Sequence, residues 1–540
     1  MAETLGNYLL DELYRRGVEH LFGVPGDYVL RFNKTTEAHP MQFINATREN
    51  TAGYMADAYA RVRGLGAVCT TYGVGLNIVN SISQAYVENS PVVLISGAPG
   101  QKELDNSPFL HHLIPKKENA RGINTQLEIL SKITVAQTCL TDPLTAPAEI
   151  QRVLNEAVWQ KRPVYIEFPR DLVLRELQAT SFPPIYPPQG DPALLKQKLN
   201  ATKALFENAK HPLIWVGHEV MRLKIADQIL RFAEKWQIPI ATSLLGKSAF
   251  DENHPLVLGV YQGEMSRPEV VKYVNQTDGL LMLGLIQTDV DTGLFTTSFE
   301  ATPKFSVKLD SNLLKEFVYQ IFNLDIKKEK NPLPNKQSPT AHSQPSSEKI
   351  TIQKALDTLQ EKISNDHLLI SDVGDCLFGA SDLVVPQNSY FSNAYFESLG
   401  FAVPGAIGLA IAQKNKRVIA LVGDGAFQMT GIELSTALRY SLDPIVILFN
   451  NQGYGTERPL IEGNFNDIVN WNYSQLPALL GGGIAVRVET CGQFAQALSD
   501  ALETRGTYTL IEIVMDKLDF SNAAKRFSQV AQALVRKNSG

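Results

Sequence analysis

The 540-residue chain is too long for one hydrophobic core, and its length predicts about three or four domains. With 44% hydrophobic and 20% charged residues it has the composition of an ordinary globular protein, and a net charge of -6 gives no basis for a nucleic-acid partner. No apolar run reaches the roughly 18 residues that a membrane-spanning helix needs, and the first residues lack a signal-peptide pattern, so we expect a cytoplasmic protein without a membrane partner.

The segment from residue 1 to 180 alternates between helix and strand patterns. Apolar Leu5, Leu9 and Leu13 recur every four residues and predict an amphipathic helix over residues 4–16. "HLFGVPGD" predicts a short strand that ends in a turn, and "GLGAVCTTYGVG", "PVVLISGAPG" and "RPVYIEFPRD" predict further strands. Helical patterns such as "GYMADAYARVRG" lie between them. This alternation predicts a parallel sheet with helices on both faces, in a first domain over residues 1–180.

The rest of the chain predicts two more domains of the same class. Strand patterns "HPLIWVG", "IPIATS" and "GLLMLG" assign residues 190–325 to a second domain. Residues 326–349 are polar and rich in proline, which is typical of a flexible linker. The alternation then resumes with "HLLISDVGD", "RVIALVGDG", "PIVILFNN" and "TYTLIEIVM", and predicts a third domain over residues 350–540. The predicted fold is α/β, with three consecutive doubly wound parallel-sheet domains of which the outer two are similar in kind.

Two polar segments follow strand patterns in the third domain. "VIALVGD" places Asp424 at the end of one strand, and "PIVILFNN" places Asn450 and Asn451 at the end of another. Because ligands of α/β sheets bind at the carboxyl ends of the strands, these two ends are expected to meet if the strands are neighbours. The segment "GIELSTALRYSL" would then be the crossover helix between them.

The residue types at these two strand ends are those that bind a hard cation. The Asp424 carboxylate, the Asn451 amide oxygen and the Gly453 carbonyl could supply three oxygen ligands to Mg²⁺ and leave room for phosphate groups. Gly423 and Gly425 would let phosphate oxygens approach the backbone. Alone, "GDG" is more typical of a tight turn and "NN" of a loop. Together, each after a strand, they predict a site for a cation and a diphosphate.

"GDGAFQMT" followed by "FNN" resembles the thiamin-diphosphate motif, and the resemblance extends over essentially all 540 residues. It is to the thiamin-diphosphate-dependent 2-keto acid decarboxylase family, whose members act on pyruvate, indolepyruvate, phenylpyruvate or branched-chain keto acids. The resemblance implies a pyrimidine-binding domain over 1–180, a central domain without cofactor and a diphosphate-binding domain over 350–540, with thiamin diphosphate and Mg²⁺ as cofactors. Each active site of the family is shared by two chains, which implies a homodimer or homotetramer with sites at the dimer interface.

The family's catalytic residues can be matched one at a time. Glu49, in "ATRENTAGY", matches the glutamate that hydrogen-bonds the pyrimidine ring of the cofactor. Asp27, in "GVPGDYVL", and the pair His111 and His112, in "PFLHHLIP", match groups that move protons during product formation and release. Glu457, in "QGYGTERPL", matches the glutamate placed over the substrate carboxylate. Without the resemblance, Glu49 would read as an ordinary acid at a helix start and the two histidines as loop residues.

The same matching implies which residues bind the cofactor. Leu399, in "ESLGFAVPGA", corresponds to the bulky apolar residue that bends the cofactor in this family. The implied cofactor-binding residues are Glu49, Gly374, Asp375, Leu399, Gly423, Asp424, Gly425, Ala426, Asn451, Gly453 and Tyr454, and the implied metal ligands are Asp424, Asn451 and Gly453.

Three positions are implied to line the substrate pocket: Leu377, Thr456 and Leu460. Pyruvate-specific relatives tend to carry a large aromatic residue near Leu377 and a branched aliphatic residue at Thr456, so a roomier pocket is expected here. We expect non-oxidative decarboxylation of an aromatic 2-keto acid, such as phenylpyruvate or indolepyruvate, or of a long or branched aliphatic one, to an aldehyde and CO₂. A pyruvate decarboxylase and a carboligase of the acetohydroxyacid synthase type remain as alternatives.

Overall fold

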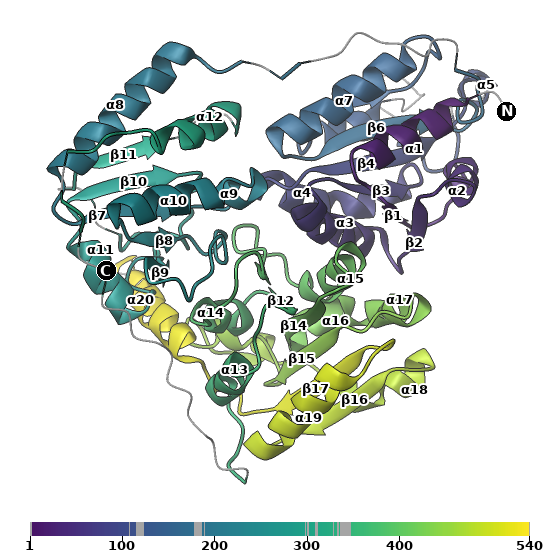
Figure 1. Ribbon diagram of the computed structural model, residues 1–540. Coiled ribbons are helices and arrows are strands. Elements are labelled where there is room, and N and C mark those ends of the chain that lie inside the picture. Colours follow the sequence, from purple (N-terminus) through teal and green to yellow (C-terminus); the bar gives the residue numbers. More distant parts are fainter. Residues whose placement is uncertain are drawn as a thin grey trace. The chain divides into compact units, whose positions relative to one another are not determined.

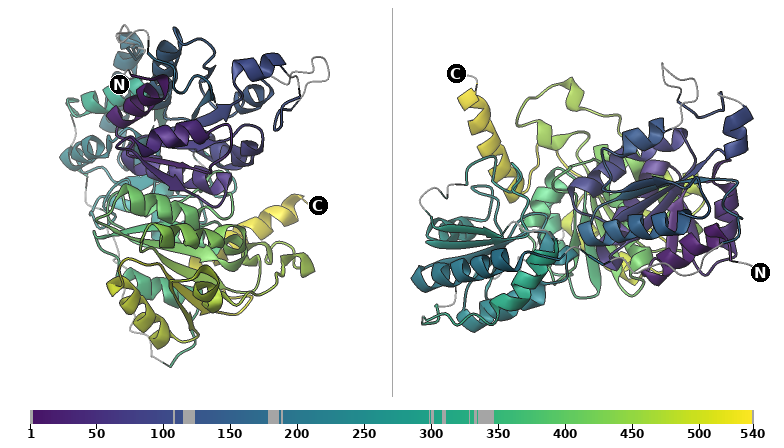
Figure 2. Two further views of the ribbon diagram at one scale, coloured as in Figure 1. Left: turned by 90° about the vertical axis from the view of Figure 1, so that its right-hand side faces the viewer. Right: turned by 90° about the horizontal axis from the view of Figure 1, so that it is seen from above.

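The structure is a computed structural model, and it describes residues 3–538 apart from 107–108, 115–123, 178–185, 188, 298, 300–301, 308–310, 328, 332–333 and 335–346. In the described residues the strands form three sheets, and the strands of each sheet run parallel (Figure 1). Helices alternate with strands along the chain (Figure 2). The predicted α/β fold with three doubly wound parallel sheets is confirmed.

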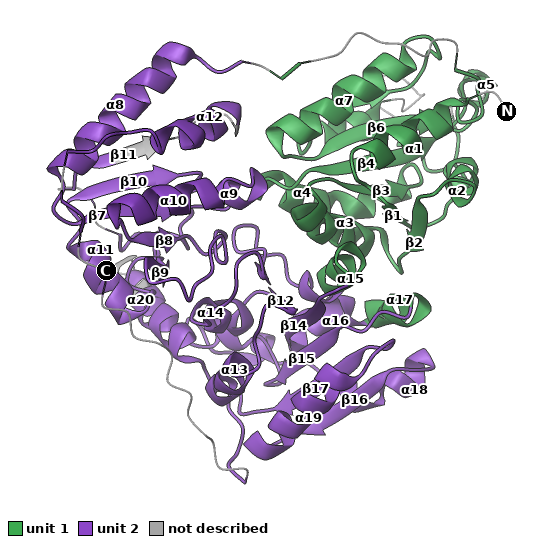
Figure 3. Cartoon of the chain, viewed as in Figure 1, with its two compact units in different colours: residues 1–187, 404–414, 432–440 green, residues 188–403, 415–431, 441–540 purple. Residues whose placement is uncertain are grey.

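The chain divides into two compact units (Figure 3). Unit 1 consists of Met1–Pro187, Pro404–Lys414 and Ile432–Tyr440, and unit 2 consists of Pro188–Val403, Asn415–Gly431 and Ser441–Gly540. The first sheet lies in unit 1 and the other two sheets lie in unit 2. The predicted domain boundaries at residues 180, 190, 325 and 350 stay predictions, and most of the predicted linker 326–349 lies outside the described residues.

The first sheet has the strand order β2-β1-β3-β4-β6-β5. Its strands are β1 (His20–Gly23), β2 (Gln42–Asn45), β3 (Gly66–Thr70), β4 (Val92–Ala98), β5 (Gln137–Cys139) and β6 (Val164–Pro169). The helices along this part of the chain are α1 (Leu5–Arg15), α2 (Leu30–Glu37), α3 (Glu49–Arg63), η1 (Val74–Ile78), α4 (Val79–Val87), α5 (Gln101–Asn106), α6 (Thr125–Leu130) and α7 (Ala146–Gln160).

Helices α1 and α7 cover one face of this sheet, and α3 and α4 cover the other (Figure 1). Leu5, Leu9 and Leu13 of α1 are fully buried in the core that α1 shares with α7. Thr4 caps the helix because its side chain accepts the N–H of Asn7 at 3.3 Å. The helix predicted over residues 4–16 is therefore confirmed, and the four-residue spacing of its leucines reflects burial of one face.

The middle sheet has the strand order β11-β10-β7-β8-β9. Ile214 and Val216 of β7 face a core with α8, α10 and α12, whereas Leu213 and Trp215 face α11, so alternate residues serve opposite faces. The strands are β7 (Pro212–Val216), β8 (Ile240–Thr242), β9 (Val257–Val260), β10 (Gly279–Leu283) and β11 (Lys304–Val307). The helices are α8 (Pro192–Asn208), α9 (Glu219–Arg222), α10 (Ala226–Trp236), α11 (Pro268–Asn275) and α12 (Ser311–Ile321).

The third sheet has the order β13-β12-β14-β15-β17-β16, which repeats the order of the first sheet when the strands of each are counted from its own first strand. The strands are β12 (His367–Ser371), β13 (Tyr390–Phe391), β14 (Arg417–Gly423), β15 (Ile445–Asn450), β16 (Ile484–Val488) and β17 (Thr509–Val514). The helices are α13 (Ile352–Gln360), α14 (Asp375–Ser381), α15 (Ala402–Ala412), α16 (Asp424–Thr430), η2 (Gly431–Glu433), α17 (Leu434–Arg439), η3 (Gly455–Glu457), η4 (Asn464–Asn466), η5 (Tyr473–Gln475), α18 (Leu476–Leu480), α19 (Cys491–Glu503) and α20 (Asn522–Asn538). The outer two sheets are thus similar in kind, as predicted.

The connection between β14 and β15 differs from the single helix predicted over "GIELSTALRYSL". Helix α16 already begins at Asp424, directly after the strand, and it ends at Thr430. The ring of Phe427 packs against Gly431, where a Cβ would lie 2.4 Å from the ring, and the chain continues as η2 and then α17. The crossover is therefore built from α16, the short helix η2 and α17, and its break falls at a glycine that has no room for a side chain.

In the described part of the chain, no helix combines the length and the apolar character that crossing a membrane requires.

Candidate active site

The ends of β14 and β15 meet, as expected from the sequence. The two strands are paired in parallel with Gly423 opposite Phe449. The buried Asp424 carboxylate accepts the backbone N–H groups of Gly425 at 2.8 Å and of Gly453 at 3.1 Å. Burial raises the pKa of Asp424 to about 6, although the backbone N–H donors oppose the shift. A cation beside this carboxylate would stabilise its ionised form, which is the chemistry that a metal site needs.

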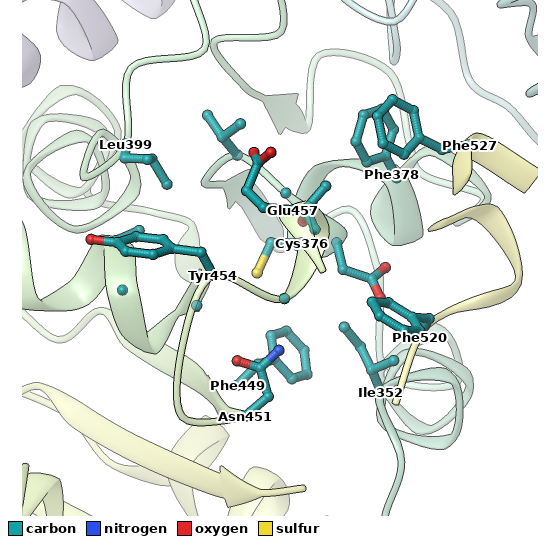
Figure 4. A pocket seen from close by; sticks show the side chains of 18 of the residues that line it. Ile352, Cys376, Phe378, Leu399, Phe449, Asn451, Tyr454, Glu457, Phe520 and Phe527 are labelled. Atoms are coloured by element: carbon teal, nitrogen blue, oxygen red, sulfur yellow. The ribbon is translucent and has the colours of Figure 1, made fainter. Parts of the chain in front are cut away.

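The two asparagines after β15 have different surroundings. Asn450 donates through Nδ2 to Glu512 Oε1 at 2.7 Å and to Asn470 Oδ1 at 3.0 Å, which ties the end of β15 to its neighbours. Asn451 lines a cavity beside the strand ends (Figure 4). Asn451, the predicted metal ligand, is therefore the asparagine that faces open space.

The three glycines around Asp424 have different surroundings. A Cβ at Gly425 would lie 2.7 Å from the ring of Tyr454, and a Cβ at Gly453 would lie 2.0 Å from the carbonyl oxygen of Asn466. At Gly423, by contrast, no heavy atom lies within 4 Å of a Cβ position. The backbone at Gly423 therefore borders open space, whereas the other two glycines allow the chain to pack closely around the carboxylate.

The cavity beside the strand ends has a volume of about 300 Å³ and lies entirely within unit 2. Many residues predicted for the cofactor and the substrate surround this one space. They are Gly374, Asp375, Leu399, Gly423, Gly425, Ala426, Asn451, Gly453, Tyr454, Thr456 and Glu457.

One wall of the cavity is aromatic, which the sequence motifs did not predict. Phe378 of α14 and Phe527 of α20 are stacked, with ring centroids 4.4 Å apart and an angle of 18° between the rings (Figure 4). Phe449 and Phe520 also line the cavity. Leu399 lies across the cavity from the stacked pair in the same view. These side chains suit a ligand with a large apolar group.

Only one of the three predicted substrate residues lines the cavity. Thr456 does so, whereas Leu377 is fully buried and Leu460 is half-buried, and neither is part of the lining. On α14 the cavity is lined instead by the two neighbours of Leu377, Cys376 and Phe378. Adjacent residues of a helix point in different directions, so a shift of one position exchanges a core residue for a cavity residue.

Asp375 lines the cavity, but its carboxylate is directed at the start of α20. It accepts the N–H of Ser521 at 2.8 Å and also the Ser521 hydroxyl. Burial raises the pKa of Asp375 to about 6, and the two donors from Ser521 oppose this shift. Because Ser521 directly precedes α20, Asp375 holds the helix that carries Phe527 against α14. The family match alone did not predict this structural role.

Asp372, directly after β12, holds the segment that carries Leu399. Its buried carboxylate accepts the N–H groups of Gly400 at 3.0 Å and of Ala402 at 2.8 Å. Gly400 has a φ of +89°, which glycine adopts at little cost. Leu399 reaches the cavity from this fixed turn (Figure 4).

Glu49 is the first residue of α3 in unit 1, as its position in the motif predicts. Its Oε2 accepts Nδ2 of Asn77 at 2.9 Å. The chain just before the helix is held by Glu433, whose Oε1 accepts the N–H of Thr47 at 3.1 Å. These contacts orient the Glu49 side chain at the start of α3.

Asp27, His111 and His112 come together in unit 1. His111 Nε2 lies 2.7 Å from Asp27 Oδ2, and His112 Nε2 lies 3.9 Å from Asp27 Oδ1. Partial burial raises the pKa of Asp27, but the hydrogen bond and the positive charge of His111 outweigh burial, so the net pKa is lowered. Asp27 is therefore an ionised carboxylate that accepts a hydrogen bond from His111 and orients its ring.

The surroundings of this group disfavour a metal ion. One potential ligand atom from each of Asp27, His111 and His112 lies within 4.8 Å of the others, a spacing that a transition metal could use. However, Arg170 Nη1 lies 3.8 Å from Asp27 Oδ2, and its charge opposes a second cation. The ring of Tyr28 stacks on His111 at 4.9 Å and fixes the imidazole.

Several cavity residues come from strand ends that the sequence analysis did not consider. Asp289, Val290 and Leu294 follow β10 of the middle sheet, and Met515 and Asp519 follow β17. Both segments lie beyond the carboxyl end of a parallel strand, the same signal that pointed to the "GDG" and "NN" segments. Applying that rule to every predicted strand would have found them.

Three family profiles match the chain, and each match covers part of one sheet region. All three are described as parts of a thiamine pyrophosphate enzyme. The N-terminal TPP binding domain matches residues 3–119, the central domain matches residues 199–313, and the C-terminal TPP binding domain matches residues 372–513. The N-terminal match includes Glu49 and Asp27, and the C-terminal match includes the ends of β14 and β15.

The chain is also similar to curated proteins along nearly its whole length. It is 33% identical over 543 residues to an indole-3-pyruvate decarboxylase of Azospirillum brasilense, in a match that covers 97% of this chain and 98% of that protein. It is 33% identical over 539 residues to an alpha-keto-acid decarboxylase of Mycobacterium tuberculosis, with coverages of 96% and 95%. An alpha-keto-acid decarboxylase of Mycobacterium leprae is 30% identical over 550 residues, with coverages of 98% and 96%. Matches of this extent, together with the three profiles, show that the chain belongs to the thiamine pyrophosphate enzyme family.

Proposed function

We propose that the chain decarboxylates a 2-keto acid non-oxidatively to an aldehyde and CO₂, with thiamin diphosphate and Mg²⁺ as cofactors. The observation that carries the proposal is the buried Asp424 carboxylate where β14 and β15 end, next to Gly423, Gly425 and Asn451, which line the cavity. The names of the relatives, indole-3-pyruvate decarboxylase and alpha-keto-acid decarboxylase, support this class of reaction.

The residues present fit a diphosphate that is bound through Mg²⁺. The Asp424 carboxylate, the Asn451 amide and the Gly453 carbonyl are oxygen donors of the kind that Mg²⁺ prefers, and together they leave positions for phosphate oxygens and water. Asp424 is a buried carboxylate, which a cation would stabilise. The open space at Gly423 supports the close approach of a phosphate group to the backbone.

The remaining site residues would orient the cofactor and the substrate. When bound, thiamin diphosphate supplies a thiazolium ring that accepts the electron pair released as CO₂ leaves. Glu49 would hold a hydrogen bond at the pyrimidine ring, and Leu399 would fix the conformation of the cofactor. Glu457, which lines the cavity, would face the substrate carboxylate. The apolar wall would exclude water from the reacting atoms.

Asp27, His111 and His112 would deliver the proton that the aldehyde product needs. The 2.7 Å contact between Asp27 and His111 supports this role, since it orients the imidazole that would donate the proton. A carboligase of the acetohydroxyacid synthase type joins two keto acids and does not need this proton delivery. The histidine pair therefore favours decarboxylation over carboligation.

The cavity supports a preference for aromatic or long-chain keto acids. The stacked Phe378 and Phe527, together with Phe449 and Phe520, provide a large apolar surface, and Thr456 occupies little of the space. We expect kcat/KM to be at least about tenfold higher for phenylpyruvate or indolepyruvate than for pyruvate, since each buried methylene group contributes roughly 1–3 kcal/mol in such a pocket.

Substitution of the aromatic wall tests this preference. Phe527→Ala is expected to lower kcat/KM for phenylpyruvate by about tenfold and to change the value for pyruvate by less than about threefold, because pyruvate has no group that reaches the wall. Phe322→Ala, at a partly exposed phenylalanine outside the cavity, is the matched control and should leave both values unchanged. Aldehyde and CO₂ formation, measured for each substrate with added thiamin diphosphate and Mg²⁺, gives the comparison.

Two outcomes would contradict the proposal. Pyruvate as the best substrate, or an equal effect of Phe527→Ala on both substrates, would remove the argument from the aromatic wall. An acetohydroxy acid as the main product would instead support the carboligase alternative. Thiamin diphosphate released from the purified protein on acid denaturation would support the cofactor assignment independently of the substrate.

We infer further that the chain assembles as a homodimer or homotetramer in the cytoplasm. Exposed apolar side chains in the segment after Glu457 support an interface with another chain, because surfaces of this kind are usually covered. They are Ile461, Phe465, Val469 and Trp471. Light scattering that finds only monomers with bound cofactor would contradict the assembly, and cell fractionation tests the location.

A further inference from the structure

Glu167 is a buried acid in unit 1 that the proposed reaction does not use. It lies in β6 and is only 3% exposed. Its Oε1 accepts the hydroxyl of Tyr165 at 2.9 Å, and the side chains of Tyr72 and Cys139 also hydrogen-bond to it. Three donors around one carboxyl group suit an ionised carboxylate, which can only accept hydrogen bonds.

A continuous path of hydrogen bonds leads from Glu167 to a glycine beside the catalytic histidines. Tyr165 has one hydroxyl proton and donates it to Glu167. Its oxygen therefore accepts a hydrogen bond from Nε2 of Gln126 at 2.7 Å. Nε2 of Gln126 also donates to Ser96 Oγ at 2.9 Å. Both amide protons are then used, and Gln126 Oε1 accepts the N–H of Gly73 at 2.7 Å. The side chains along this path are buried, so the pattern is shielded from water.

Gly73 is the point at which this path reaches the histidine segment. It has a φ of +70°, and a Cβ there would lie 2.0 Å from the carbonyl oxygen of His112, so the two backbones are in direct contact. His112 itself has a φ of +68°. The carbonyl of His111 is held separately, by the Tyr28 hydroxyl at 3.1 Å. The position of His112 thus depends on where the backbone of Gly73 is held.

We propose that Glu167 is a positioning residue for His112, because its carboxylate sets the direction of the hydrogen bonds that hold Gly73 in place. The inference rests on the proposed role of His112 in proton delivery. A neutral acid or an amide at position 167 can donate to the Tyr165 oxygen. The Tyr165 proton would then turn away from Glu167, toward Gln126 or toward Ser96, which also hydrogen-bonds to Tyr165. When it points at Gln126, the Gln126 amide has to turn over. Its NH₂ group would face the N–H of Gly73, and two donors would oppose each other.

The same arrangement is sensitive to pH. Burial raises the pKa of Glu167 to about 7, although its three donors oppose the shift. Burial also raises the pKa of Tyr72, Tyr165 and Cys139, so these groups stay protonated and remain donors. Glu167 is the member of this cluster that changes protonation near neutral pH. Above this pH the ionised carboxylate fixes the direction of the hydrogen bonds that hold Gly73. Below it the protonated acid no longer fixes that direction.

Glu167→Gln tests the proposal because it keeps the size of the side chain and removes its charge. In the holoenzyme at pH 8, hydrogen exchange of peptides that contain Gly73 and His112 is expected to be at least about tenfold faster than in the wild type. We expect kcat to fall at least about tenfold and KM to change less than about threefold, since a misplaced proton donor slows a step after substrate binding. Near pH 5.5 the wild-type carboxyl is protonated too, and the two proteins should exchange alike.

Thermal stability separates positioning from a general loss of structure. The folded-state pKa of Glu167, about 7, lies above its ordinary value of 4.5, so the wild type loses stability as pH rises through this range. Glu167→Gln has no such loss. The difference in Tm, variant minus wild type, should therefore be larger at pH 8 than at pH 5. The kcat of the variant should fall further below that of the wild type over the same range. A purely structural role would lower Tm and kcat together at both pH values.

Two further variants keep the test decisive. Gln126→Met cuts the path with Glu167 intact and should reproduce the faster exchange and the lower kcat. Cys139→Ala removes a donor that is not on the path, and exchange near Gly73 should stay within about twofold of the wild type. Wild-type exchange near Gly73 in both Glu167→Gln and Gln126→Met would overturn the proposal, as would faster exchange with unchanged kcat. If the wild type decarboxylates no keto acid, the proposed function fails while exchange still reports on the path.

Discussion

Glu49→Gln is expected to lower kcat by about 10³-fold, the middle of the range that a single acid–base group contributes. Glu49 is the first residue of α3, and its carboxylate would lie at the pyrimidine ring of the cofactor. Glutamine has the same size and can keep the hydrogen bond with Asn77, but it cannot give up or take a proton at the ring. Steady-state kcat at saturating thiamin diphosphate and Mg²⁺ measures the effect.

Cofactor affinity and a matched substitution are the controls for this result. The residues proposed to hold Mg²⁺ and the diphosphate all lie in unit 2, so the Kd for thiamin diphosphate should change less than about tenfold in Glu49→Gln. Glu156→Gln makes the same chemical change on α7, where Glu156 accepts Nε2 of Gln160 at 2.6 Å, and should leave kcat unchanged. A kcat of Glu49→Gln within about threefold of the wild-type value would refute the role of Glu49.

The strands that the sequence predicted are buried apolar runs. Strands β14 and β15 are buried on both faces, so they appear as continuous apolar runs that composition alone reveals. Strand β2, which was not predicted, lies at a sheet edge, and polar Gln42 and Asn45 interrupt its apolar run. Strand β9 was missed although its four residues are buried, because it is short and contains Gly259.

The proposed metal and diphosphate end of the site rests on short local motifs, so its residues could be located from the sequence. Asp424 directly follows one strand and Asn451 directly follows the end of its neighbour, so the pairing of two predicted strands is enough to bring them together. The cavity also borders the point where the strand order reverses, between β12 and β14, because residues after both strands line it. Ligands of doubly wound sheets bind at such points.

The aromatic wall was not predictable, because it depends on contacts between distant parts of the chain. Phe527 reaches the cavity from α20, which is held by Asp375 at Ser521 and by Asp382 at Arg526. The facing residue is Phe378, one position beyond the predicted Leu377. A match to a family motif gives the segment, but the orientation of the helix decides which of its side chains faces the ligand.

Asp424→Asn is expected to lower the affinity for thiamin diphosphate by more than about 100-fold at saturating Mg²⁺. Losing a partner that only orients a metal ligand already costs about 10–100-fold in affinity, and Asp424 is proposed to be a direct ligand. Asparagine keeps an oxygen that can accept the N–H of Gly425 or of Gly453, so the local backbone should stay in place. It removes the charge that attracts the cation. Calorimetric titration of the variant with the cofactor measures the loss.

Asp519→Asn is the matched control for this prediction. Asp519 lines the same cavity from the segment after β17, and its carboxylate accepts the N–H of Ile352 at 2.8 Å. The substitution makes the same chemical change at a carboxylate that lines the cavity, and the Kd should stay within about threefold of the wild-type value. Equal losses in both variants would mean that the total negative charge of the cavity, and not Asp424 as a ligand, attracts Mg²⁺. Asp424 follows β14, whereas Asp519 follows β17. A loss of cofactor affinity in Asp424→Asn alone would therefore place the cation between β14 and β15.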